Sequence, residues 1–238
     1  MSDLLDAARS LWTDLADSPI GFGTGGSTVV VSSGSRLCPP GWVGVVRLGD
    51  SALITAPTES IGAAVSEAVA DLVTVELTDP DEWRRRLPVA DVLGPAFLDY
   101  LSPNDFTPMN TDRVVAVSAD STDLAGLLAR VDPSDADESG LASIDSPAFV
   151  VHGPASSEAI AAAGYSRVHG VAAHLCVLTD PEHRGHGLAG ATASAAVEHA
   201  LSAGLLPQWR ARVPASLAVA QRLGFSRLGR QLSLMLST

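Results

Sequence analysis

The 238-residue sequence contains no lysine and is short of positive charge and of aromatic residues. All 15 basic residues are arginine, and the chain has 27 acidic residues, which gives a net charge of -12. So acidic a chain repels nucleic acid, and an aromatic content of 5% leaves few rings on which bases could stack. We therefore expect no nucleic-acid partner.

Cysteine and long hydrophobic runs are also scarce. Cys38 and Cys176 lie far apart, so neither a disulfide framework nor a metal site of cysteine ligands is indicated. Residues 1–6 carry acids where a secretory signal has a basic region. Residues 18–35 carry no charged side chain. They are nevertheless rich in Gly, Ser and Thr, which makes this stretch too polar to lie in a bilayer. We expect a cytoplasmic protein with no metal and no membrane association.

The charge that is present is spread unevenly along the chain. Residues 1–112 hold 16 acids and 6 arginines, whereas residues 113–238 hold 11 acids and 9 arginines. The acidic first half should attract cations, and the nearly neutral second half can more easily accept an anionic ligand.

Residues 113–238 show a regular alternation of apolar patterns. The order of elements predicted there is β-α-α-β-β-β-α-β-α-β. The strands fall at 113–118, 148–151, 159–165, 168–179, 208–213 and 225–236, and the main helices at 122–131, 187–203 and 214–222.

Residues 1–112 have a weaker pattern. It predicts a helix at 4–15, a strand at 28–32, a hairpin at 43–55 that turns at Gly49-Asp50, and a helix at 61–72. Pro, Asp and Gly recur from 79 to 112, so we place a boundary near residue 112. We expect an α/β protein with a mixed sheet, in which 1–112 is a smaller α/β domain of unassigned role and 113–238 is the larger one.

The segment Arg184-Gly-His-Gly-Leu-Ala189 follows an uncharged strand and begins a helix. Such a loop presents backbone N-H groups and the positive end of the helix to one point in space. No acid lies between Glu182 and Glu198 to occupy that point. The pattern therefore predicts an anion site.

This segment resembles the coenzyme A loop of the GNAT superfamily, with Arg184, Gly187 and Ala189 at the matching positions. Pro214 to Leu217 and Leu223-Gly-Phe225 resemble the late helix of the same family. The resemblance implies a GNAT acyltransferase fold for 113–238 and transfer of an acetyl group from acetyl-CoA to a primary amine. It also implies donor-binding residues, namely Val177, Leu178, Thr179, Arg184, Gly185, His186, Gly187, Leu188, Ala189 and Gly190.

The acidic first half suggests a cationic acceptor, either a small molecule or a peptide, and a homodimer is left open. A dinucleotide site is the competing reading, because Gly185-x-Gly187-x-x-Gly190 also matches the Rossmann pattern. That pattern needs an acid at the end of the next strand, where this chain has Gln208 and arginines. The same spacing of glycines in residues 21–26 is followed by a strand, so we interpret it as a loop.

The family's usual proton-transfer residues are missing. Its tyrosine acid falls at Ala220, its asparagine at Val213, and its two glutamate positions at Ala173 and Gln208. These departures favour, as an alternative, an acyl-CoA-binding sensor or regulatory module without turnover.

His174 is the titratable residue nearest the implied acyl group and is the candidate general base. Strand alternation turns it away from Leu175 and Val177, which favours a structural role, and Cys176 shares its face. Tyr100, Tyr165 and Trp209 are further candidates, for which packing is the favoured interpretation.

Overall fold

A computed structural model describes residues 2–154 and 157–237, and the chain divides into two compact units. The first comprises Met1–Asp99 and Arg227–Thr238, and the second comprises Tyr100–Ser226. This division differs from the expected boundary near residue 112. The last strand, β10 (Ser226–Leu236), pairs antiparallel with β2 (Val43–Leu48) and so returns to the first unit.

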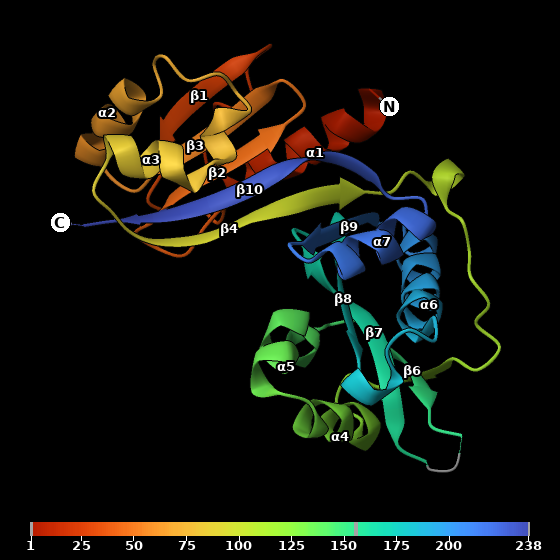
Figure 1. Ribbon diagram of the computed structural model, residues 1–238. Helices are drawn as coiled ribbons and strands as arrows, with labels where there is room; N and C mark the ends of the chain where they lie inside the picture. Colours follow the sequence, from red (N-terminus) through yellow and green to blue (C-terminus); the bar gives the residue numbers. More distant parts are fainter. Residues whose placement is uncertain (1, 155–156, 238) are drawn as a thin grey trace. The chain divides into compact units, whose positions relative to one another are not determined.

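The first unit is an α/β structure built on a mixed sheet in the order β1-β3-β2-β10-β4 (Figure 1). β1 runs parallel to β3, whereas β2 is antiparallel to both β3 and β10. Its elements are α1 (Ser2–Leu15), β1 (Gly26–Val31), β2, β3 (Ser51–Ala56), α2 (Glu59–Ala68), η1 (Glu76–Thr78), α3 (Pro80–Arg86), β4 (Val89–Tyr100) and β10.

The predictions for this unit are largely confirmed. The first helix, the strand after it and the hairpin are present, and Gly49 has the positive φ of 62° that its turn requires. Residues 21–25 form a loop that leads from a helix into β1, as interpreted, so these glycines do not join a strand to a helix. One hydrophobic cluster packs Val65 of α2 and Trp83 of α3 with residues of β2 and β10, and α1 contributes further buried residues, among them Leu11.

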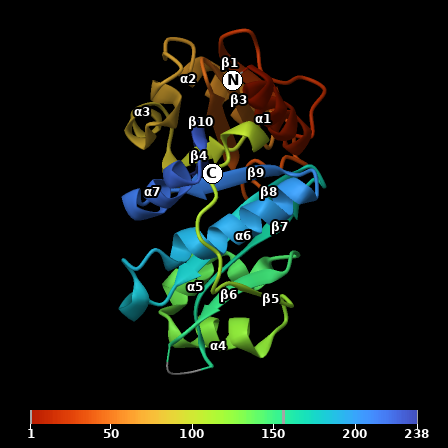
Figure 2. The same cartoon turned by 90° about the vertical axis from the view of Figure 1, so that its right-hand side faces the viewer.

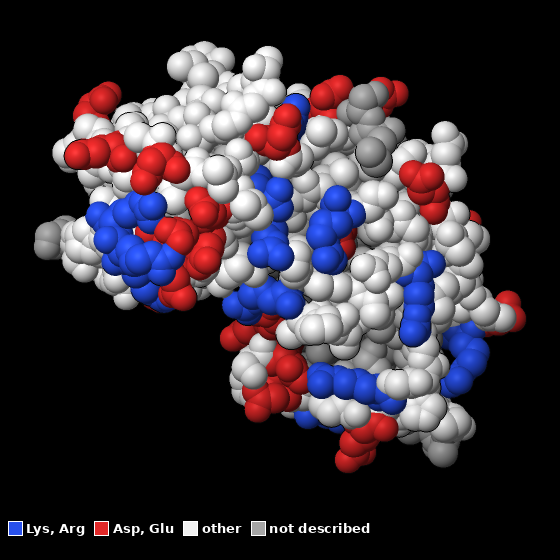
Figure 3. Space-filling model, turned by 45° about the horizontal axis from the view of Figure 1, so that its top comes forward, with Lys and Arg blue, Asp and Glu red and all other residues white. Residues whose placement is uncertain are grey.

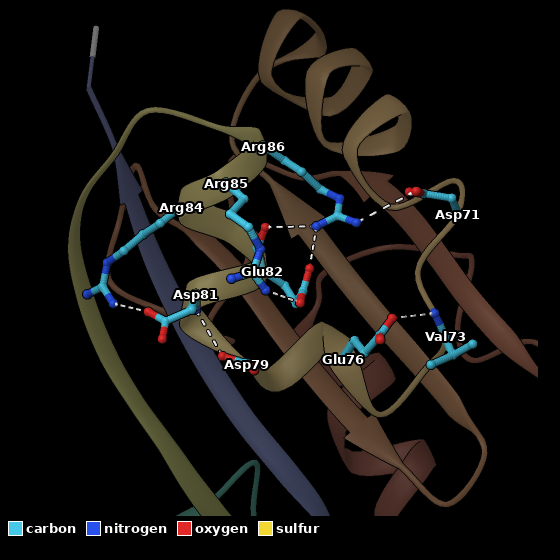
Figure 4. Close-up of polar contacts among 9 residues, drawn as sticks. All are labelled: Asp71, Val73, Glu76, Asp79, Asp81, Glu82, Arg84, Arg85 and Arg86. Carbon is cyan, nitrogen blue, oxygen red and sulfur yellow. Dashed lines mark hydrogen bonds and ion pairs between the residues drawn. The ribbon is translucent and has the colours of Figure 1, made fainter.

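A run of three arginines on α3 is neutralised within its own unit (Figure 4). Arg84 pairs with Asp81 at 3.0 Å, Arg85 with Glu82, and Arg86 with both Glu82 and Asp71. Figure 3 shows the resulting mixture of blue and red surface at the left, over α3. A self-paired cluster of this kind is a solvated helix face and offers no uncompensated positive patch for a polyanion.

The second unit contains the sheet β5-β6-β7-β8-β9, in which neighbouring strands are antiparallel except for the parallel pair β8 and β9. Its elements are η2 (Pro103–Asp105), β5 (Val115–Val117), α4 (Thr122–Arg130), α5 (Pro133–Ser139), η3 (Leu141–Ser143), β6 (Ala148–His152), β7 (Ala159–Val168), β8 (Ala172–Thr179), η4 (Pro181–His183), α6 (Leu188–Ser202), β9 (Leu206–Ala211) and α7 (Pro214–Arg222). The predicted order of main elements in 113–238 is confirmed, apart from short 3-10 turns.

One boundary in this unit was predicted wrongly. Val168 was assigned to the strand that ends at Thr179, but it belongs to β7, and a tight turn separates the two strands. The N-H of Val171 donates to the carbonyl of Val168 at 3.1 Å, and both His169 and Gly170 have positive φ. Two consecutive positive φ values are typical of the turn that matches the twist of a hairpin.

Helices cover the two faces of this second sheet. α4 packs on one face, where Leu124 and Leu127 contact Ala162 of β7 and Cys176 of β8. α6 packs on the other face, across β6, β7 and β8, as Figure 2 shows. α6 can lie close to the strands because its buried positions are small: Gly190, Ala193, Ala196 and Ala200 among them. Within residues 2–154 and 157–237, none of the helices has both the length and the apolar character to cross a bilayer.

The packing of α4 supplies a test of this core. Leu127→Ala should lower the free energy of unfolding by about 2 to 5 kcal/mol, since the side chain is fully buried and its removal leaves a cavity. Leu128→Ala, at the next and partly buried position, should cost clearly less. Urea unfolding of both variants is the measurement, and equal losses would contradict the packing described for α4.

Candidate functional site

The site begins where β8 ends, at a loop that leads directly into α6. Gly187 is the N-cap of α6 with a φ of 77°, and Gly185 has a φ of 83°. An added Cβ would meet nothing within 4 Å at either position, so the backbone conformation is what requires glycine there.

The first turn of α6 is left open to a ligand. Gly187 makes no side-chain cap hydrogen bond, and the first turn contains no acid. The first N-H groups of a helix have no acceptor within it, and they sit at the positive end of the helix dipole. The residues predicted to hold an anion thus form a continuous set of backbone donors, without a side chain that competes for them.

Beside this loop, the pairing of β8 with β9 stops early. The register runs from Ala172 with Leu206 only as far as His174 with Gln208. β8 continues to Thr179 and β9 to Ala211, so the facing edges of the two strands separate. Val177, Leu178 and Thr179 pair with β7 on their other side, which leaves one edge of their backbone toward the gap.

A pocket of about 710 Å³ occupies this gap. Figure 3 shows blue and red surface around a hollow in the lower half of the view. The lining includes the residues predicted for the donor, except His186, together with one side of α7 and part of α5: Met109, Asp135, Glu138, Ser139, Leu175, Val177, Leu178, Thr179, His183, Arg184, Gly185, Gly187, Leu188, Ala189, Gly190, Trp209, Arg210, Ala211, Arg212, Val213, Ala215, Ser216, Ala218, Val219 and Arg222.

The two walls of the pocket follow from strand alternation. Cys176 of β8 packs with the α4 cluster, so its face is the one that α5 also covers. His174 shares this face of β8, and Gln208, its partner in register, carries the face onto β9. Arg212 confirms the assignment, since it pairs with Glu138 of α5. Trp209, on the other face, donates to Ser216 of α7 at 3.0 Å.

His174, the candidate base, is not among the residues that line the pocket. The expected orientation is confirmed: Leu175 and Val177 line the pocket, and His174 lies on the alternate side of the strand. Burial and, to a smaller extent, the charge of Arg210 lower the pKa of His174 to about 3, although a hydrogen bond with Gln208 opposes the shift. The ring is therefore neutral at neutral pH and a very weak base.

Polar contacts tie His174 into the structure. Gln208 donates from Nε2 to the hydroxyl of Tyr100 at 2.7 Å, and Tyr100 is fully buried. The Nδ1 atom of His174 is buried and has no hydrogen-bond partner among the described residues. Tyr100 is therefore a packing residue that also has a polar role, because its hydroxyl accepts the hydrogen bond that holds Gln208 beside His174.

Of the remaining candidates, Cys176 and Tyr165 lie outside the pocket and Trp209 lines it. Burial raises the pKa of Cys176 to about 11, so it is a thiol that packs under α5. The hydroxyl of Tyr165 lies 2.9 Å from Nδ1 of His199 on α6, and neither residue lines the pocket. Trp209 does line it, with its ring 5.5 Å from that of Phe225.

Charged residues complete the site. Arg184 pairs with Asp135 of α5 at 2.6 Å and donates from Nε to the carbonyl of Thr179 at 3.3 Å. His183 and His186 stand on the same loop, but in the described part of the chain no group of three or more His, Cys, Asp or Glu residues is placed to hold a metal ion.

Several lining residues were not anticipated from the sequence, namely Met109, Asp135, Glu138, Arg210 and Arg212. The arginines carry a readable signal, since Gln208-Trp-Arg-Ala-Arg212 repeats polar side chains at every second position of a strand. The acids of α5 carry no such signal, because nothing in the sequence indicates that this short helix packs on β8 beside the pocket.

Comparison with known proteins gives a family match for part of the second unit and a shared fold for the chain. The family model described as GNAT acetyltransferase matches residues 155–230. The comparison with curated proteins gave no match. A GNAT-family acetyltransferase structure from Colwellia psychrerythraea is similar over 99% of this chain and 97% of its own, with a TM-score of 0.51 and 12% identity. An X-ray structure of a Drosophila protein is similar over 98% and 89%, with a TM-score of 0.51 and 16% identity.

These likenesses show a shared fold. The α/β fold with a mixed sheet, predicted as a GNAT fold for the C-terminal half, is confirmed. The sequence of β9 also argues against a dinucleotide site. It has Gln208 and an arginine where a Rossmann fold needs the acid that binds the ribose.

The lowered pKa of His174 predicts an acid sensitivity of folding. A histidine with a folded pKa of about 3 and an ordinary unfolded value of 6.5 stabilises the protein fully above pH 6.5. This stability is lost as the pH falls toward 3, at no more than about 1.4 kcal/mol per pH unit.

His174→Gln should remove that contribution, so its free energy of unfolding should fall less steeply than that of the unchanged protein between pH 6.5 and 4. Urea unfolding at pH 7, 5.5 and 4.5 measures the slopes. His186→Gln, at an exposed position, is the control and should leave the slope unchanged. Identical slopes for all three proteins would show that His174 is not held neutral.

Proposed function

We propose, from the match of the GNAT acetyltransferase family model to residues 155–230, that the protein is an N-acyltransferase that moves an acetyl group from acetyl-CoA to a primary amine. Family and fold support acyl transfer in general. The observation that carries the specific proposal is the open first turn of α6, at Gly187, beside the unpaired edge of β8.

The donor fits this arrangement in two parts. The N-H groups of residues 185–190 and the positive end of α6 suit a pyrophosphate, and Arg184 adds a guanidinium at the same loop. The separated edge at residues 177–179 offers backbone groups to the amide-rich pantetheine arm. Ala215, Ala218 and Val219 of α7 form a small-residue wall opposite, which leaves room for that arm.

Catalysis in this proposal depends mainly on positioning and on backbone dipoles. A backbone N-H directed at the thioester oxygen stabilises the negative charge that develops there, and removal of one such donor typically costs about 10² to 10³ in rate. Holding the two reactants in line contributes about 7 to 11 kcal/mol. His174, with its pKa of about 3, adds little as a base.

Ser216 is a candidate for stabilising the leaving sulfur. It lines the pocket one helical turn before Ala220, the position at which the family's tyrosine acid would stand. Its hydroxyl accepts a hydrogen bond from Trp209 Nε1 at 3.0 Å, which leaves its own hydrogen to donate.

The expectation of a cationic acceptor rests on the acidic first half alone. Among the described residues of the second unit, the acids Asp135 and Glu138 line the pocket, and Glu138 is suited to attract an ammonium group. Cytoplasmic location, the absence of nucleic-acid and membrane partners, and a homodimer stay predictions.

The alternative function is an acyl-CoA-binding sensor without turnover. The observation that favours it is the set of substitutions at the family's proton-transfer positions, where Ala220 and Ala173 carry no polar group. Incubation with acetyl-CoA and a broad panel of amines, with release of free CoA thiol as the signal, separates the two. Tight binding without transfer to any amine would favour the sensor, and the absence of binding would contradict both.

Donor binding has a sharper test at Ala189, in the first turn of α6. Ala189→Glu should preserve the fold, since an acid is favourable near a helix N-terminus. It should nevertheless weaken acetyl-CoA binding at least about tenfold, equivalent to about 1.4 kcal/mol, because it places a negative charge beside the pyrophosphate.

The matched control for this test is Ala189→Gln, which has nearly the same size and no charge. Calorimetric titration with acetyl-CoA gives both dissociation constants, and thermal unfolding checks the fold. Equal constants for the two variants would show that the pyrophosphate does not bind at α6.

A further inference from the structure

The α5 side of the pocket holds two arginines that the donor does not need. Arg210 lies on β9 and Arg212 directly follows it, and both line the pocket. Strand alternation places them on the face that α5 covers, opposite to Trp209 and α7. The donor contacts proposed above use the glycine loop, the edge of β8 and the α7 wall, so these guanidiniums face the other reactant.

Glu138 of α5 stands among the same residues. It pairs with Arg212, and its charge also acts on Arg210. Both members of the Arg212 pair are about half exposed, at 49% and 56%, and such a pair contributes only about 0 to 1 kcal/mol. A ligand that supplies a better placed carboxylate can therefore exchange with Glu138 at little cost.

The charge balance of the pocket runs against that of the chain. The chain has a net charge of -12, yet among the described residues the pocket is lined by four arginines and two acids. Arg210 is exposed on β9, and the positive charges of Arg210 and Arg212 oppose each other. An anionic group on the ligand reduces this repulsion.

We propose that the acceptor is an amine that also carries a carboxylate, such as a free amino acid, and that Arg210 and Arg212 bind this carboxylate. This inference rests on the proposed acyltransferase function and specifies its substrate class. Guanidinium groups match a carboxylate through paired, charge-assisted hydrogen bonds. Glu138 lies on the same wall and attracts the ammonium group of the same molecule, so the wall is complementary to a zwitterion.

The reaction balances with this acceptor. The ammonium group loses one proton to solvent, and the neutral nitrogen attacks the thioester carbonyl. The C-N bond forms, the C-S bond breaks, and the second proton leaves the nitrogen as the sulfur becomes the thiol of free CoA. The carboxylate takes no part in these steps, so its binding affects KM more than kcat.

The test uses pairs of acceptors that differ only in the carboxylate: alanine with ethylamine, and phenylalanine with phenethylamine. The full chain should use the amino acid of each pair with a kcat/KM at least about tenfold higher, as a charge-assisted pair of hydrogen bonds predicts. Arg210→Gln and Arg212→Gln should each raise KM for the amino acid at least about tenfold and leave KM for the amine unchanged. The lysine variants at both positions should recover part of the loss.

Two controls separate this proposal from the function on which it rests. Arg113→Gln, at an exposed arginine of the same unit outside the pocket, should change neither KM. Calorimetric titration with acetyl-CoA should give the same dissociation constant for the glutamine variants as for the unchanged protein.

The outcomes are distinct. Equal use of both members of each pair, or equal effects of the variants on both members, would overturn the carboxylate site while acyl transfer stands. Transfer to no acceptor would overturn the proposed function, and titration of CoA-loaded protein with alanine and phenylalanine then decides the site. Binding that Arg212→Gln abolishes would support the site, and no binding would overturn it as well.

Discussion

The early end of strand pairing between β8 and β9 is the constraint on which the rest of the site depends. The ladder stops at His174 and Gln208, although both strands continue. Backbone groups that would otherwise have bonded to each other are left facing a gap, and buried backbone groups without partners are costly. A ligand with many amide groups would satisfy these backbone groups, which is why the proposed donor suits the break in the ladder.

The end of β9 is held by contacts on both walls of the pocket. On the α5 side, Arg212, which follows β9, pairs with Glu138. On the other side, Trp209 donates to Ser216 of α7 and its ring packs against that of Phe225. Beyond the last shared hydrogen bonds, β9 is thus tied to α7, whereas residues 177–179 of β8 stay paired with β7.

Much of this could be predicted from the sequence, for reasons that are local. The uncharged run before Thr179 indicates a buried strand, and the glycines at 185 and 187 each report a backbone requirement at their own position. Alternation along β8 correctly predicted that His174 and Leu175 lie on opposite faces of the strand. The turn at His169-Gly170 was missed because a short apolar run does not show where one strand ends and the next begins.

The rest depends on contacts between segments far apart in the sequence. The pairing of Arg184 with Asp135, and of Gln208 with Tyr100, joins residues separated by 49 and 108 positions. Pattern and propensity carry no information about such distances. The same limit explains the domain boundary, because nothing in residues 226–236 indicates that they complete the sheet of the first unit.

That last strand has a consequence for how the protein is made. β10 lies between β2 and β4 in the sheet of the first unit, and its Leu232 and Leu234 belong to the core of that unit. The ribosome releases the second unit in full before it releases the strand that the first unit lacks. The segment synthesised first must therefore wait, with an apolar face uncovered, until the end of the chain emerges to close it.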